Sequence, residues 1–158
     1  MKIRKMLPED KAPVIQILRT TGMFSKEEVA VAEELIDIFL KNKDQKDYLI
    51  YVSDDDGTVT GYVCYGPAPA TDGTFDLYWI AVSPEWQNKR IGKQLLAFVE
   101  EKISTEGGRI IIIETSSQGK YIPTQEFYKR NLYNIEARIS GFYSPGDDRL
   151  IFVKRFQV

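Results

Sequence analysis

The chain has 158 residues, of which 43% are apolar and 12% aromatic, and its formal net charge at pH 7 is -2. This length and apolar content predict one compact domain over residues 1–158, and the charge argues against binding to a nucleic-acid backbone. The chain has no histidine and a single cysteine, Cys64. These counts exclude His-based metal sites, zinc clusters, Ser-His and Cys-His catalytic groups and intramolecular disulfides.

Membrane insertion is not expected from the sequence. The N-terminal segment carries cations with no apolar run behind them, and no other segment approaches the roughly 20 apolar residues that a spanning helix needs. We therefore expect a soluble protein in the cytoplasm. Cys64 is expected to be an inert, buried thiol on a strand.

The N-terminal half reads as a strand, two helices and a hairpin. Residues 2–6 can form a short strand, and residues 8–22 begin with Pro and acids and end in Gly, as helices tend to do. Residues 25–42 carry a stronger helix signal because Ser25 and Glu28 match a capping box. The two β-rich runs that follow flank an Asp-Gly pair, which predicts a hairpin.

The C-terminal half alternates strands with helices. Residues 74–82 read as a strand, residues 91–103 have helical apolar spacing, and residues 107–115 form the continuous apolar run typical of a strand buried on both faces. This order predicts a right-handed parallel crossover. Residues 122–133 follow as a short helix, and residues 136–156 as two strands around a Pro-Gly-Asp-Asp loop. The fold class is therefore mixed α/β.

The junction of the crossover carries an unusual set of side chains. The segment "VSPEWQNKRIGKQLL", residues 82–96, joins the strand to the helix. Main-chain N–H groups at a helix start are unpaired and can hold phosphate, and Lys89, Arg90 and Lys93 add positive charge while Gly92 allows close approach. A Walker loop is excluded because its required Gly and Ser or Thr are absent. From the residues alone, a solvated cationic first turn is an equal alternative.

The same segment resembles the coenzyme A pyrophosphate loop of the GNAT superfamily of N-acetyltransferases. The family pattern is Gln or Arg, two variable residues, Gly, one variable residue, then Gly or Ala, with Arg90 here in the place of the first Gly. The residues that fit are Gln87, Asn88, Lys89, Ile91, Gly92 and Lys93. Downstream, "QEFYKRNLY" is similar to the family's Phe-Tyr helix through Phe127 and Tyr128, whereas Leu132 and Tyr133 replace a Gly-Phe pair. The resemblance covers essentially the whole chain.

The resemblance implies both a fold and a cofactor site. The sheet is mixed and mostly antiparallel with helices on both faces, and the 74–82 and 107–115 strands form a parallel pair that splays into a V-shaped slot. Acetyl-CoA would be the co-substrate, with no metal. Pantetheine would bond to the main chain of Ile80 and Val82, the pyrophosphate would meet the amides from Gln87 to Lys93, and Thr124 would border the other side.

Acetyl transfer to an amine requires two proton transfers. The amine must lose a proton before it attacks the thioester, and the leaving thiolate must regain one. Tyr128 matches the family's usual proton donor. Asp76 falls where some members carry a catalytic Glu, while Glu114 and a water chain are rival candidates for the base.

The acceptor pocket is implied by the family's helix pair and last loop. Its expected residues are Phe24, Glu27, Glu114, Tyr143, Asp147 and Asp148. Acidic and aromatic side chains suit a cationic amine, either a small molecule or a peptide. Two other functions stay open: a non-catalytic acyl-CoA sensor or interaction domain, and a nucleotide-binding regulatory domain. A homodimer is also left open.

Overall fold

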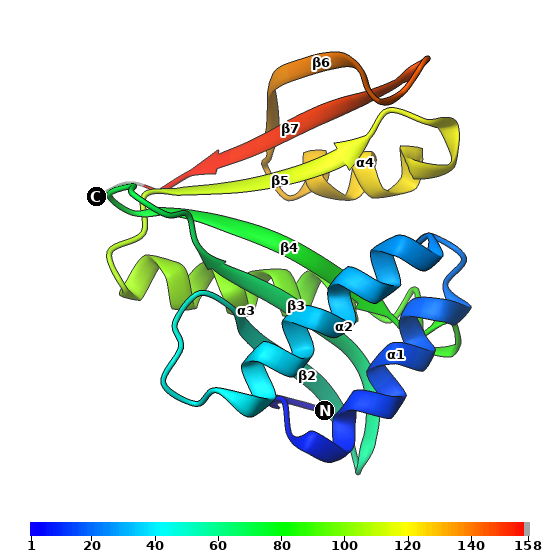
Figure 1. Ribbon diagram of the computed structural model, residues 1–158, viewed down its shortest axis with the longest axis vertical. Helices are drawn as coiled ribbons and strands as arrows, with labels where there is room; N and C mark the ends of the chain where they lie inside the picture. Colours follow the sequence, from blue (N-terminus) through cyan, green and yellow to red (C-terminus); the bar gives the residue numbers. More distant parts are fainter. Residues whose placement is uncertain (157–158) are drawn as a thin grey trace.

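The protein is built on one seven-stranded sheet. The computed structural model describes residues 1–156 and has the strand order β1-β2-β3-β4-β5-β7-β6 (Figure 1). The strands are β1 (Lys2–Lys5), β2 (Leu49–Asp55), β3 (Thr58–Pro67), β4 (Thr74–Val82), β5 (Ile110–Ser116), β6 (Asn134–Ser144) and β7 (Asp147–Arg155). Only β4 and β5 pair in parallel, and every other neighbouring pair is antiparallel. The mixed, mostly antiparallel sheet is thus confirmed.

Helices cover both faces of the sheet. They are α1 (Lys11–Thr20), α2 (Lys26–Lys41), α3 (Ile91–Thr105) and α4 (Ile122–Arg130). In Figure 1, α1 and α2 lie over one face, beside β2 and β3, and α3 and α4 lie behind the other face. Within residues 1–156, none of the helices combines the length and the apolar character that a bilayer crossing requires.

Two apolar cores result from the alternation of side chains along the central strands. On β3, Val63 and Tyr65 pack on the side of α3 and α4, whereas Tyr62 and Cys64 pack on the side of α1 and α2. Burial raises the pKa of the Cys64 thiol well above its ordinary value, so the thiol stays protonated. The expected inert, buried cysteine is confirmed.

Local signals set most element boundaries. The Ser25 hydroxyl accepts a hydrogen bond from the Glu28 N–H at 3.1 Å, and the Glu28 carboxylate accepts one from the Ser25 N–H at 3.0 Å, which confirms the capping box of α2. Asp56 and Gly57 both have positive φ, 50° and 88°, as a tight hairpin turn requires. The β2–β3 hairpin is therefore confirmed.

The start of α1 and the end of α4 differ from the sequence-based expectation. Pro8–Asp10 forms a separate 3-10 turn, so α1 begins at Lys11 instead of residue 8. The Asp10 carboxylate accepts hydrogen bonds from the Leu7 N–H and from Arg4, which holds this turn apart from the helix. At the other end of the chain, α4 stops at Arg130, because Leu132 adopts a φ of 70° that no helix can continue.

The parallel pair of strands separates after a short contact. Pairing between β4 and β5 extends only from Thr74–Ile110 to Asp76–Ile112. A bulge between β3 and β4 near Tyr78 bends β4 further. The splayed slot is thus present, and beyond Asp76 the β5-facing edge of β4 has no strand partner.

Candidate functional site

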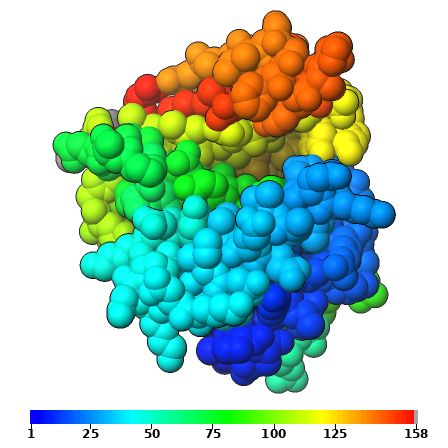
Figure 2. Space-filling view, viewed as in Figure 1, coloured from blue at the N-terminus to red at the C-terminus, as the bar shows by residue number. Residues whose placement is uncertain are grey.

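The splayed strands open into a large cleft of about 1290 Å³. Its walls come from β4, the loop before α3, the first turn of α3, α4, the end of β5 and the α1–α2 connection. Figure 2 shows the surface hollowed between the blue N-terminal helices and the orange and red C-terminal hairpin. The cleft therefore reaches from the loop with the cationic side chains to the far end of the sheet.

The loop before α3 lies at one end of the cleft. Asn88 and Arg90 hold positive φ angles of 65° and 62°, so the chain turns sharply before α3 begins at Ile91. The N–H groups of the first turn of α3 have no intrahelical acceptor and carry the positive end of the helix dipole. Arg90 and Lys93 line the cleft beside them. This arrangement can hold a pyrophosphate.

The side chains of Gln87 and Lys89 contact neighbouring residues of the protein. The Gln87 side chain donates a hydrogen bond to the Val82 carbonyl at 3.3 Å, which ties the loop to the end of β4. The Lys89 ammonium lies 4.6 Å from the centre of the Trp86 ring and outside the lining of the cleft. The other expected cofactor residues line the cleft; they are Ile80, Val82, Gln87, Asn88, Arg90, Ile91, Gly92, Lys93 and Thr124.

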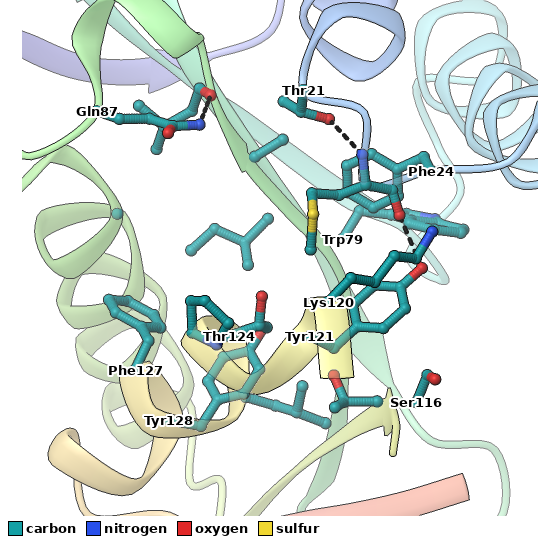
Figure 3. A pocket seen from close by; sticks show the side chains of 18 of the residues that line it. Thr21, Phe24, Trp79, Gln87, Ser116, Lys120, Tyr121, Thr124, Phe127 and Tyr128 are labelled. Carbon is teal, nitrogen blue, oxygen red and sulfur yellow. Dashed lines mark hydrogen bonds between the residues drawn. The ribbon is translucent and has the colours of Figure 1, made fainter. Parts of the chain in front are cut away.

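Tyr128 lies along the wall between the two ends. Figure 3 shows Gln87 toward one end of the cleft, Tyr121 and Ser116 toward the other, and Thr124 and Tyr128 between them. Tyr128 is 4% exposed and its ring packs on Phe127, Tyr133 and Phe152. Burial raises the pKa of its phenol well above the ordinary value, so the hydroxyl is a neutral hydrogen-bond donor at any physiological pH.

A hydrogen bond joins two walls of the cleft. The Tyr121 hydroxyl donates to the Met23 carbonyl at 2.9 Å, linking the start of α4 to the α1–α2 connection (Figure 3). Phe24 packs on Trp79 from the same connection, with ring centres 5.7 Å apart. This part of the cleft is thus lined by the aromatic rings of Phe24, Trp79 and Tyr121.

The two candidate bases occupy different positions. Asp76 lies at the last paired position of β4 and is absent from the lining of the cleft, whereas Glu114 lines it. Burial raises the pKa of the Asp76 carboxyl, and the charge of Arg149 opposes part of that shift. Glu114 forms an ion pair with the same Arg149. Both carboxylates therefore share one neighbouring cation.

The raised pKa of Asp76 predicts how folding stability depends on pH. Because the folded protein holds the protonated carboxyl better than the unfolded chain does, folding stability falls as pH rises from about 3.8 through the folded-state pKa. Asp76→Asn should therefore melt higher than the parent at pH 7. This gain in melting temperature should disappear at the acid end of a pH series. Identical pH profiles for the two proteins, with Asp44→Asn as a surface control, would contradict it.

The expected acceptor residues divide into two groups. Phe24, Glu114, Tyr143 and Asp147 line the cleft, whereas Glu27 and Asp148 do not. Glu28 lines the cleft in place of its neighbour Glu27. The Asp148 carboxylate instead accepts hydrogen bonds from Arg138 at 2.7 Å and from the Gly141 N–H at 2.9 Å, which fixes the β6–β7 hairpin.

Comparison with known proteins identifies the family. The family profile described as "Acetyltransferase (GNAT) family" matches residues 13–132. The chain belongs to the GNAT acetyltransferase family. The cleft described above is accordingly the cleft of a GNAT-family fold.

Several relatives of this GNAT protein have related sequences or structures. A solved GNAT-family protein from Desulfovibrio desulfuricans is 41% identical, with 98% of each chain covered and a TM-score of 0.94. S-(2-succino)cysteine N-acetyltransferase from Bacillus subtilis is 30% identical over 108 residues, which are 66% of this chain and 64% of that enzyme. PaiA N-acetyltransferase from Thermoplasma acidophilum, solved with coenzyme A, shares the fold at 22% identity, with 98% of each chain covered and a TM-score of 0.76.

Other residues of the GNAT cleft were not expected from the sequence. They are chiefly Trp86, Ser116, Lys120, Tyr121, Phe127, Arg130 and Asn131. Arg130 and Asn131 end α4 and adjoin the cleft together with Lys93 of α3, so the cationic rim is wider than the loop alone. A helical projection of α4 places residues 127, 130 and 131 on one side, and could have indicated them.

Proposed function

We propose that this GNAT protein transfers the acetyl group of acetyl-CoA directly to a primary amine in a ternary complex. The observation that carries this proposal is the continuity of the cleft, which runs from the cationic loop, past Tyr128, to the polar end near Asp147. Coenzyme A would lie with its pyrophosphate on the α3 loop and its pantetheine along the unpaired edge of β4. The acceptor would enter from the opposite end.

The proposed reaction needs two proton movements. The amine nitrogen attacks the thioester carbonyl, the carbon–nitrogen bond forms, and the carbon–sulfur bond breaks to release a thiolate. The Tyr128 hydroxyl lies beside the slot and would hydrogen-bond to that thiolate and return a proton to it. Since Asp76 lies behind the lining, the amine proton would leave through water toward Asp76 or Glu114.

No covalent acyl-enzyme is part of this proposal. The sole cysteine, Cys64, is fully buried on β3, its pKa is raised by burial, and it does not line the cleft. Direct transfer therefore needs no nucleophile from the protein. A cytoplasmic location belongs to the proposal as well, and the unpaired thiol is compatible with it.

The acceptor is proposed to be a small-molecule amine. The hydrogen bond between Tyr121 and Met23 bridges two walls of the cleft near the proposed acceptor end, which favours a compact molecule over a folded protein surface. The name of the Bacillus subtilis relative specifies S-(2-succino)cysteine, an amino acid with several carboxylates. This compound is a reasonable member of an acceptor screen for the present protein.

Ligand protection tests the cofactor part of the proposal. Coenzyme A or acetyl-CoA at about 100 times its Kd should raise the melting temperature by roughly 5–10 °C, because only the folded protein binds it. ATP at the same concentration should give a much smaller shift, since it lacks the pantetheine that the β4 edge would hold. Equal protection by ATP, or none by coenzyme A, would contradict the assignment.

A further inference from the structure

Asp147 and Arg149 are side chains of opposite charge that lie two residues apart on β7. Residues i and i+2 of a strand project from the same face, so Asp147 and Arg149 share one face. The contacts with β5 support this placement, because Asp147 contacts Ser116 and Arg149 contacts Glu114. Ser116 and Glu114 are also two residues apart on their strand. Asp147 lines the cleft at its proposed acceptor end, whereas Arg149 lies outside the lining, beside Glu114, which lines it.

Asp147 is a buried carboxylate without a cationic partner. It is 8% exposed and lines the cleft. The Ser116 hydroxyl donates a hydrogen bond to its Oδ1 at 2.5 Å, and no lysine or arginine of residues 1–156 forms an ion pair with it. Since a buried carboxylate is stabilised by a cation, an incoming ammonium group would supply the partner that the protein does not.

Arg149 has a hydrogen-bond donor without an acceptor. Its Nε–H is buried and has no hydrogen-bond acceptor in the described part of the chain. Its guanidinium contacts Glu114 and lies 4.7 Å from the centre of the Phe142 ring. Glu114 and Phe142 are themselves 42% and 50% exposed, so both can move aside. A ligand carboxylate that displaces Glu114 could accept from both Nε and Nη2, the bidentate geometry that arginine favours.

We propose that the acceptor is a free amino acid, held by Arg149 at its carboxylate and by Asp147 at its amine. This inference rests on the proposed acetyl transfer and specifies its substrate class. The two charged groups of a zwitterion would then meet the complementary charges of β7. Its side chain would extend toward the aromatic pair of Phe24 and Trp79.

Lys120 is the competing cation at this end of the cleft. It lines the cleft and its ammonium lies 5.0 Å from the centre of the Tyr121 ring. Its side chain is exposed and belongs to a 3-10 turn, whereas Arg149 is held on a strand by two contacts. Arg149 is therefore assigned as the carboxylate-binding residue, and a Lys120 variant tests that choice.

The experiment compares acceptors that differ only in the carboxylate. A set of L-amino acids, including S-substituted cysteines, is assayed with acetyl-CoA, and the best one is then compared with its amide and its decarboxylated amine. We expect the amino acid to have the highest kcat/KM. Arg149→Gln should raise KM for the amino acid by about 30–100-fold, change kcat by less than about threefold, and leave the amide unaffected.

The other variants separate the proposed roles. Asp147→Asn should raise KM for the amino acid and the amide alike, because both carry the amine, and Arg149→Lys should recover part of the loss. Arg155→Gln is the matched control, since Arg155 lies on the same strand and pairs only with the exposed Glu136. Loss of carboxylate selectivity in Lys120→Gln and not in Arg149→Gln would overturn the assignment.

Failure of this inference can be told apart from failure of the proposed function. If amides or polyamines are acetylated better than every amino acid, acetyl transfer stands and the zwitterion site is overturned. If no amine is acetylated, transfer itself fails. Amino-acid binding is then measured by thermal shift with coenzyme A present, and a shift that is the same in the parent and Arg149→Gln overturns the site as well.

Discussion

Tyr128→Phe is expected to lower turnover by about 100- to 10,000-fold, the range typical of a positioned proton donor, while coenzyme A affinity stays unchanged. The variant removes one oxygen from a ring that is 4% exposed and packed against Phe127, Tyr133 and Phe152. Those ring contacts remain in phenylalanine. The expected loss therefore reports on the hydroxyl and not on the fold.

The pH dependence of that loss is also specified. Burial raises the pKa of the Tyr128 phenol, so the hydroxyl remains protonated from pH 6 to pH 9. The ratio of parent to variant turnover should therefore stay constant over this range. A deficit that vanishes with pH would mean that water protonates the thiolate and that Tyr128 only packs.

Tyr62→Phe is the matched control for this experiment. Tyr62 is fully buried on β3, lies outside the cleft, and its hydroxyl has no hydrogen-bond partner in the described residues. Removing an unpartnered buried hydroxyl should leave stability equal or slightly higher and leave turnover unchanged. Loss of turnover in both variants would show that buried tyrosines act through packing.

Gly92→Asp should reduce coenzyme A affinity by about 30-fold or more. Gly92 is the second residue of α3, where the proposed pyrophosphate meets unpaired N–H groups. A carboxylate placed a few ångströms from two phosphate charges repels them by on the order of 2 kcal/mol or more. The same carboxylate favours the positive end of the helix dipole, so the free protein should be as stable as the parent or more so.

Gly92→Ala is the control for the added side chain. A Cβ on Gly92 would lie 3.6 Å from the Phe127 ring and 3.8 Å from Val82, which are ordinary contacts. The alanine variant should therefore fold and retain most of its coenzyme A affinity. Titration of the three proteins by calorimetry gives the comparison, and an Asp variant that binds like the parent would place the phosphates elsewhere.

The sequence predicted those parts of the fold that depend on local signals. The capping box of Ser25 and Glu28 and the Asp56-Gly57 turn each involve a few adjacent residues, and both are present. The end of α4 was not predicted, because the positive φ of Leu132 has no local sequence signal. It depends on how the chain turns into β6, which is a tertiary property.

The candidate site was likewise predicted well where it depends on local sequence and less well where it depends on tertiary structure. The loop motif predicted which residues gather at the start of α3, since the motif is contiguous. The acceptor end was predicted less well, because Glu28 lines the cleft instead of Glu27, and Asp147 lines it without Asp148. Which of two neighbouring acids faces the cleft depends on the rotation of α2 against the sheet and on the register of the β6–β7 hairpin.

A β-bulge near the site further limits how well side chains can be placed from the sequence. Counting along β4 puts Asp76 in a catalytic position only if the strand is regular, yet β3 and β4 shift register at Tyr78. Asp76 also lies where β4 and β5 are still paired, before the slot opens. The ion pair of Arg149 with Glu114 could not be predicted from the sequence for a related reason, since it joins residues 35 positions apart.

The most direct test of direct acetyl transfer measures both products in one reaction. The protein is mixed with acetyl-CoA and an amine, and free coenzyme A and the acetylated amine are quantified together by mass spectrometry. We predict equal amounts of the two products, loss of both in Tyr128→Phe, and no acetylated protein when the amine is omitted. A protein that binds acetyl-CoA tightly yet acetylates no amine, or that does so equally well with Phe at position 128, would contradict this account and favour an acyl-CoA sensor.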